Sequence, residues 1–112
     1  MGATFFIGYL DDKSLHTTLN RYASDSLEML IDEALKESYP KLYEIIMEVI
    51  VLDQIHFIDL NKQEFNTAVT VIRNCLQNRD SPTEGQIKQK HIWESEIEPL
   101  IQQDKRYEDT NK

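Results

Sequence analysis

The chain has 112 residues, of which 40% are hydrophobic and 29% are charged, a balance typical of one globular domain. Its 20 acidic and 12 basic residues give a formal net charge of −8, and the basic residues are scattered, which argues against nucleic-acid binding. No apolar run approaches the roughly 18 residues of a membrane span, and no signal-peptide or lipid-anchor motif is present. The single cysteine, Cys75, excludes an intrachain disulfide. We therefore expect a cytoplasmic protein with no membrane or nucleic-acid partner.

The N-terminal part begins with an apolar segment, residues 5–10, that is too short to distinguish a strand from a buried helical turn. A helix is predicted from Asp11 or Asp12 to about Ala23, with the two acids favourably placed at its N-terminus. Its apolar positions are Leu15, Leu19 and Tyr22.

A second helix is predicted to begin at Asp25, whose side chain can form a capping box with Glu28. It ends near Ser38 and Tyr39, because a residue that precedes proline disfavours the helical conformation. Its apolar face consists of Leu27, Leu30, Ile31, Ala34 and Leu35.

A third helix is predicted to begin at Pro40, because the first helical position does not need the N–H that proline lacks. The segment that follows it, Val51 to Phe57, stays apolar, and we expect it to lie deep in the protein as a turn between helices. The buried stripe of this helix consists of Leu42, Ile45, Ile46, Val49 and Ile50.

Two further helices complete the chain. Asn61 and Glu64 form a capping-box pattern that begins the fourth helix, whose inner face consists of Phe65, Ala68, Val69, Ile72 and Leu76. Ser81, followed by Pro82 and Glu84, begins the fifth, with Ile87, Trp93, Ile97, Leu100 and Ile101 as buried positions. Pro99 should kink this last helix, and residues from about 104 to 112 form a frayed tail. The predicted fold is an all-α single domain, residues 1–112, built as a bundle of about five helices.

One segment resembles a calcium-binding loop only superficially. The window from Asp53 to Glu64 begins and ends like an EF-hand loop. However, Ile55 and Phe57 supply no side-chain oxygen, and Ile58 stands where the sharp turn requires glycine. The sequence therefore does not support calcium binding here.

The residues that could carry catalysis or bind a metal are isolated from one another. His91 and Glu94 share a helix face, but a metal site in a helical bundle needs ligands from other helices as well. His16 and His56 have no evident partner, and we interpret all three histidines as surface or boundary residues. Cys75 lies on an apolar helix face and is interpreted as a buried, inert thiol. The sequence thus predicts no catalytic residue, metal site, cofactor or enzymatic activity.

Negative charge is concentrated between Asp25 and Glu64, where ten carboxylates face three lysines. Acids four residues apart on a helix repel each other by about 0.2–0.5 kcal/mol per pair. Binding of a basic partner would explain this concentration, although a solvated face that maintains solubility is an alternative. Tyrosines beside the acids are typical interface anchors. The predicted partner-binding residues are Glu28, Asp32, Tyr39, Tyr43, Glu44 and Glu48.

The chain resembles small immunity proteins of contact-dependent growth-inhibition systems in two segments, Phe5–Leu10 and Phe65–Arg73. It is also similar to them in its size, its acidity and its lack of a catalytic motif. The segment Asp80–Gly85 also resembles an Asp-Ser-Pro-Glu-Gly stretch of the four-helix colicin-nuclease immunity proteins, with Thr83 inserted. Ser38-Tyr39-Pro40 supplies only part of the Tyr-Tyr-Pro of that second family. The resemblance implies a bacterial immunity protein, a monomer or weak dimer, that neutralises a cognate toxin. The toxin would be a basic nuclease whose active-site cleft is covered directly or blocked from beside it.

Two other classes of function remain open. A helical adaptor or regulatory subunit would bind a partner through an apolar surface, and a large exposed patch along Val51 to Phe57 would favour it. A metal-dependent helical enzyme would be favoured by a cluster of carboxylates around His91.

Overall fold

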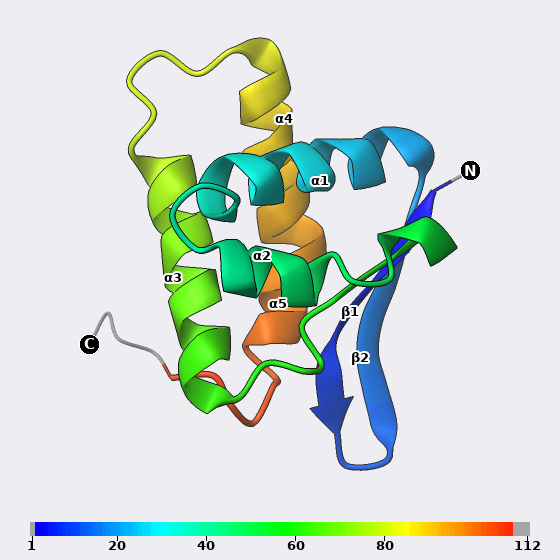
Figure 1. Ribbon diagram of the computed structural model, residues 1–112. Helices are drawn as coiled ribbons and strands as arrows, with labels where there is room; N and C mark the ends of the chain where they lie inside the picture. Colours follow the sequence, from blue (N-terminus) through cyan, green and yellow to red (C-terminus); the bar gives the residue numbers. More distant parts are fainter. Residues whose placement is uncertain (1, 109–112) are drawn as a thin grey trace.

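The computed structural model describes residues 2–108 and shows a mixed α/β fold (Figure 1). The predicted all-α class is wrong, because three strands from the first half of the chain form one sheet. These strands are β1 (Ala3–Leu10), β2 (Lys13–Leu19) and β3 (Gln54–His56), arranged in the order β2-β1-β3. The helices gather on one side of the sheet, and the core lies between the two layers.

The first two strands form an antiparallel hairpin in place of the helix predicted for residues 11–23. Asp11 and Asp12 form its two-residue turn, and Asp11 has the positive φ (56°) that such turns require at their first central residue. Leu15 and Leu19 are four positions apart, so they share one face of a strand as readily as one face of a helix. Both are buried. The leucine spacing was therefore compatible with either structure.

The third strand lies parallel to β1, with Ile55 beside Phe5, and makes β1 the central strand. It replaces part of the deep apolar turn that the sequence predicts for residues 51–57. Ile55 and Phe57 are indeed buried, but Val51 and Leu52 are strongly exposed in the 3₁₀ turn η1 (Ile50–Leu52) that precedes β3.

The next helix, α1 (Arg21–Leu35), runs unbroken through the serines at which a new helix was predicted to begin. Its N-cap is Asn20, whose side chain accepts a hydrogen bond from the backbone N–H of Ala23. The hydroxyl of Ser24 donates to the carbonyl of Arg21, so this polar side chain is satisfied inside the helix. The predicted capping box at Asp25 is therefore wrong.

The helix α2 (Pro40–Ile46) begins at proline as predicted, but it ends before the predicted stripe is complete. The helix α3 (Lys62–Gln77) confirms both the Asn61–Glu64 capping box and the complete buried face predicted for it. These two predictions depend on neighbouring residues alone.

The last helical segment begins at α4 (Glu84–Ile92), where Thr83 rather than Ser81 is the N-cap. It continues through a π-helical turn, η2 (Trp93–Ile97), into the short helix α5 (Glu98–Ile101). The irregularity immediately precedes Pro99, which removes a backbone donor there. Ile87, predicted to be buried, is exposed.

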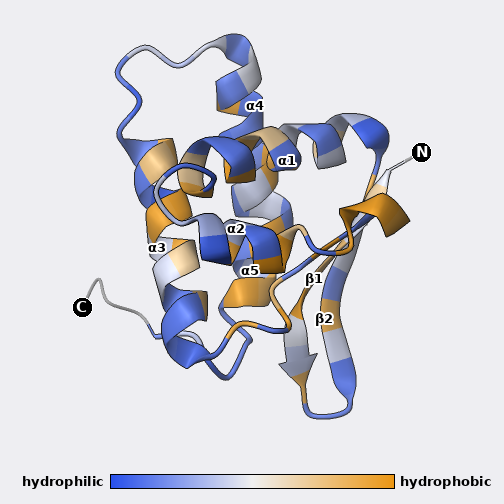
Figure 2. Cartoon of the chain, viewed as in Figure 1, coloured by the Kyte–Doolittle hydropathy of each residue, from blue (hydrophilic) through white to orange (hydrophobic). Residues whose placement is uncertain are grey.

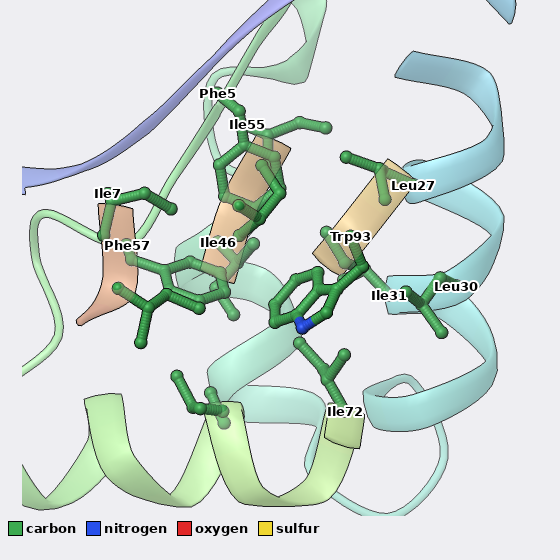
Figure 3. Packing of buried hydrophobic residues seen from close by; sticks show 14 of the residues in the cluster. Phe5, Ile7, Leu27, Leu30, Ile31, Ile46, Ile55, Phe57, Ile72 and Trp93 are labelled. Carbon is green, nitrogen blue, oxygen red and sulfur yellow. The ribbon is translucent and has the colours of Figure 1, made fainter. Parts of the chain in front are cut away.

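The indole of Trp93 occupies the middle of the core and is 1% exposed. Figure 3 shows it between Leu27 and Ile31 of α1 and Ile72 of α3, with Phe57 on the sheet side. The indole N–H donates to Glu98 at 2.7 Å. The polar edge of the largest core side chain is therefore satisfied.

Glu98 also receives a two-pronged ion pair from Arg73 of α3, in which Nε donates to Oε2 at 2.8 Å. Burial on its own favours the protonated carboxyl, but the hydrogen bonds from Arg73 and Trp93 outweigh it and lower the pKa of Glu98. This pair connects the last helical segment to α3 through charged groups that are largely withdrawn from water.

The end of the chain is packed where the sequence suggests a frayed tail, although residues 109–112 lie outside the described part. Asp104 is buried, and its carboxylate binds the guanidinium of Arg106. The same guanidinium donates to the carbonyls of Ile7 at 2.7 Å, Phe57 at 2.8 Å and Leu60 at 2.6 Å. We call this arrangement the Arg106 clamp; it joins the end of the chain to β1 and to the turn after β3.

The Arg106 clamp predicts a severe effect of Gly8→Ala. A Cβ at Gly8 would overlap Oδ2 of Asp104 and lie 2.7 Å from Nη2 of Arg106. We expect the free energy of unfolding to fall by about 1–3 kcal/mol, as for overpacked cores, measured by urea denaturation with Trp93 fluorescence. Gly85→Ala is the matched control, because its Cβ meets nothing closer than 3.9 Å. Equal stability of the two variants would contradict the clamp.

The buried Glu98 ion pair predicts acid sensitivity. Because folding lowers the pKa of Glu98, the pair stabilises the protein fully above the carboxyl pKa of the unfolded chain, about 4.3. That stability is lost as the pH falls through the lower folded pKa. Glu98→Gln should lower the free energy of unfolding by about 1.5–3 kcal/mol at neutral pH. It should also make the free energy of unfolding depend less on pH in the acidic range. Glu96→Gln, at an exposed position of the same turn, should leave both quantities unchanged.

Candidate partner-binding surface

Carboxylates from two distant segments converge where α1 faces η1. Burial raises the pKa of Glu28 above its usual range, and the negative charges of Asp25, Asp32 and Asp53 raise it further. Three of these acids lie on α1, whereas Asp53 follows η1. The fold therefore brings the carboxylate of Asp53 close to the carboxylates of α1, although these residues are far apart in the sequence.

A hollow of about 260 Å³ lies between the first turns of α1, η1 and the start of β1. We call it the acidic hollow. Its one basic residue, Arg21, lies 3.9 Å from Asp25, and both side chains are well exposed, so this ion pair neutralises little. The lining residues are Gly2, Ala3, Arg21, Ser24, Asp25, Glu28, Ile50 and Asp53.

An exposed apolar pair borders the acidic hollow. Val51 and Leu52 are 85% and 65% exposed, and their chain neighbours Ile50 and Asp53 line the hollow. Figure 2 shows η1 as an orange projection beside the hydrophilic first turns of α1. We call Val51 and Leu52 the apolar tip; together with the acidic hollow it forms one continuous surface.

The backbone at this surface is held by the sheet. Asp53 adopts a left-handed conformation (φ 58°), which aspartate tolerates better than most residues, and its N–H donates to the carbonyl of Ile50. The N–H of Thr4 in β1 donates to the carbonyl of Asp53 at 3.0 Å. The turn that carries the apolar tip is therefore anchored to the central strand.

Asp32 and Tyr43 extend the same acidic region onto α2. The hydrogen-bonding carboxylate of Asp32 raises the pKa of Tyr43 to about 12, and burial and the charges of Asp32 and Glu28 act in the same direction. Oδ1 of Asp32 is buried without a hydrogen-bond partner among residues 2–108. The ammonium group of Lys36, one helical turn after Asp32, lies 5.8 Å from the ring centre of Tyr43.

The six predicted partner-binding residues do not form one patch. Glu28, Asp32 and Tyr43 lie together, as their mutual pKa effects show. Glu44 is exposed on α2 without an ion pair to any described residue, and Glu48 faces His56.

Tyr39, the remaining predicted residue, is 39% exposed and lines a separate hollow of about 620 Å³ along α3. Sequence reasoning missed the surface residues supplied by the chain after α2, namely Val51, Leu52 and Asp53. The only local signal for them is an apolar run that ends in aspartate, a residue that favours turns.

Much of the negative charge remains uncompensated in the folded protein. Among the ten carboxylates between Asp25 and Glu64, only Asp25, Glu33 and Glu48 form ion pairs with other described residues, and Glu64 serves in the capping box. The pair of Glu33 with Arg79 lies on the side of α1 toward α3 and α4. The carboxylates left without a basic partner in that part of the chain are Glu28, Asp32, Glu37, Glu44, Asp53 and Asp59.

The single thiol does not have the setting of a nucleophile. Burial and the neighbouring carboxylate of Glu33 raise the pKa of Cys75, an effect that Arg79 only partly opposes. A raised pKa reduces the thiolate fraction at neutral pH, and the thiolate is the reactive species.

Comparison with known proteins identifies no relative. No protein-family model matches the chain, and no curated protein or solved structure matches it either. Within residues 2–108, every helix is too short or too polar to cross a bilayer.

Crowding of acids around Glu28 predicts a stabilising substitution. Since folding raises the pKa of Glu28, its ionised form opposes folding, and this effect disappears as the pH falls through the folded pKa. Glu28→Gln should raise the free energy of unfolding at neutral pH by about 0.2–0.5 kcal/mol per relieved pair. The gain should shrink toward about pH 4, where carboxyl groups protonate. Urea denaturation at both pH values tests this, with Glu94→Gln as the exposed control outside the acidic hollow.

Proposed function

We propose that this protein is an immunity protein that binds and neutralises a cognate toxin with a basic surface. The observation that carries the proposal is the acidic hollow, whose carboxylates lack sufficient basic partners, beside the exposed apolar tip. Convergent negative charge accelerates encounter with a cationic protein. Exposed apolar side chains such as Val51 and Leu52 supply contact area that becomes buried on docking.

The mechanism follows from the charge of the two surfaces. A nuclease toxin binds a polyanion and therefore presents lysine and arginine around its active site. One such side chain can enter the acidic hollow, where the carboxylates of Glu28 and Asp53 replace the water molecules that hydrate its charge. The apolar tip then packs against the adjacent toxin surface. The bound immunity protein then excludes the nucleic acid, by covering the cleft or by steric obstruction beside it. This neutralisation would take place in the cytoplasm, where the toxin's substrate lies.

The resemblance to immunity proteins of contact-dependent growth-inhibition systems supports this function. Its two segments, Phe5–Leu10 and Phe65–Arg73, correspond to β1 and to the middle of α3. Both segments belong to the elements that hold the surface, so the resemblance supports the class of protein, whereas the acidic hollow and the apolar tip support the binding itself. The proposed partner is a protein, and the chain is proposed to act without catalysis.

An adaptor function is the second candidate, and the exposure of Val51 and Leu52 favours it. An adaptor would bind chiefly through apolar contact and would need no basic partner. The apolar surface is small, however, because Ile55 and Phe57 of the same segment are buried. The acidic hollow has no role in this alternative.

Charge reversal separates the two functions. The protein is co-expressed with the toxin domain encoded beside its gene, and growth rescue is scored together with the affinity of the purified pair. Glu28→Lys with Asp53→Lys should abolish rescue and reduce affinity by more than about tenfold, chiefly through slower, salt-sensitive association. Glu44→Lys with Glu48→Lys should weaken binding less, because these residues lie outside the acidic hollow.

The matched control is Glu94→Lys with Glu96→Lys. This variant changes the net charge by the same amount, but at exposed positions of η2 that do not line the acidic hollow. It should rescue growth as the unmodified protein does. Equal binding by the Glu28/Asp53 variant and this control would refute the electrostatic surface. Loss of binding only in Val51→Ser with Leu52→Ser would instead support the adaptor.

A further inference from the structure

Three potential metal ligands from separate segments meet beside the sheet. Glu48 lies just after α2, His56 is the last residue of β3, and Asp59 lies in the turn after it. One donor atom from each lies within 4.8 Å of the other two. The interpretation of His56 as a residue without a carboxylate partner is therefore wrong.

The imidazole of His56 is withdrawn from water but lacks a hydrogen bond. Its side chain is only 10% exposed, whereas that of Glu48 is 61% exposed. The distance from Nε2 of His56 to Oε2 of Glu48 is 3.7 Å, too long for a hydrogen bond. No other group within residues 2–108 hydrogen-bonds to the ring. The ring therefore lies within reach of two carboxylates, and neither carboxylate holds it by a direct hydrogen bond.

The backbone around these ligands is held firmly. His56 pairs with Phe6 of β1, and the N–H of Phe57 donates to the carbonyl of Phe6 at 2.9 Å. Arg106 holds the carbonyls of Phe57 and Leu60, which flank Asp59. Two of the three ligands thus lie on a segment that is fixed on both sides, as an effective metal site requires.

We propose that Glu48, His56 and Asp59 bind a divalent transition-metal ion, with Zn²⁺ as the best fit. Bonds of about 2.0–2.2 Å in tetrahedral geometry separate neighbouring donors by roughly 3.4 Å. The observed 3.7 Å is close to this value, and rotation of the exposed Glu48 and Asp59 side chains suffices to close the set. An imidazole nitrogen with two carboxylate oxygens selects zinc-like ions over Mg²⁺ and Ca²⁺, which prefer oxygen ligands alone.

The site holds three protein ligands and therefore leaves one tetrahedral position for water or for a donor from another molecule. The ion would cross-link the segment after α2 to β3 and offset the two carboxylates. Because it binds only the folded arrangement, it stabilises the native state by mass action. This inference does not depend on the proposed toxin partner, since the ligands all come from this chain.

The test uses the full chain, freed of metal by chelation, in isothermal titrations with ZnCl₂ and separately with MgCl₂. Zinc should bind at one equivalent and raise the thermal unfolding midpoint, and magnesium should do neither. Glu48→Gln and Asp59→Asn, both at exposed positions, should each weaken zinc binding by at least the roughly tenfold that loss of an outer-shell partner costs. Glu44→Gln is the matched control on α2 and should bind zinc normally.

The nuclear magnetic resonance signals of the three histidine rings identify the ligand without a mutation in the buried strand. One equivalent of zinc should shift the signals of His56 and leave those of His16 and His91 in place. Zinc affinity that persists in Glu48→Gln and Asp59→Asn overturns the proposal. Loss of affinity in His16→Ala or His91→Ala, or the lack of a saturable equivalent, overturns it as well.

Discussion

The guanidinium of Arg106 holds together parts of the fold that the strands and helices leave unconnected. The bulge between Phe6 and Gly8 interrupts the ladder of β1, and the turn after β3 presents carbonyls that need donors. Buried carbonyls must be hydrogen-bonded, and Arg106 supplies donors at both places while Asp104 fixes its orientation. Its Cζ atom also lies 4.2 Å from the ring centre of Phe65, the first buried residue of α3. One charged side chain thereby joins the sheet, the turn and a helix.

The short strand β3 depends on this arrangement and in turn positions both candidate surfaces. It pairs with β1 over only three residues, too few to hold a strand by ladder bonds alone. The apolar tip and Asp53 lie immediately before it, and His56 and Asp59 lie at its other end. A loss of the Arg106 clamp would therefore disturb the proposed docking surface and the proposed metal site together, although neither contains Arg106.

Local sequence patterns predicted the features that local interactions create. The capping box of Asn61 with Glu64, the start of α2 at Pro40 and the inner face of α3 are all correct, because each depends on residues within a few positions. The hairpin was missed because Leu15 and Leu19 fit either period, and β3 was missed because parallel pairing joins residues about fifty positions apart. The acidic hollow, too, could not be predicted from local sequence patterns. Glu28 was identified on α1, but its proximity to Asp53 exists only once β3 has paired with β1.

The placement of the acids supports the proposed binding role over a role in solubility alone. A net negative charge keeps a protein soluble wherever the charges lie, and dispersed carboxylates achieve this without repelling one another. In this fold, Glu28 is instead partly buried among three other acids, an arrangement that raises its pKa and opposes folding. The exposed Val51 and Leu52 beside them reduce solubility rather than improve it. Repelling charges and exposed apolar side chains both become favourable when a basic surface covers them, and a single docking event relieves both.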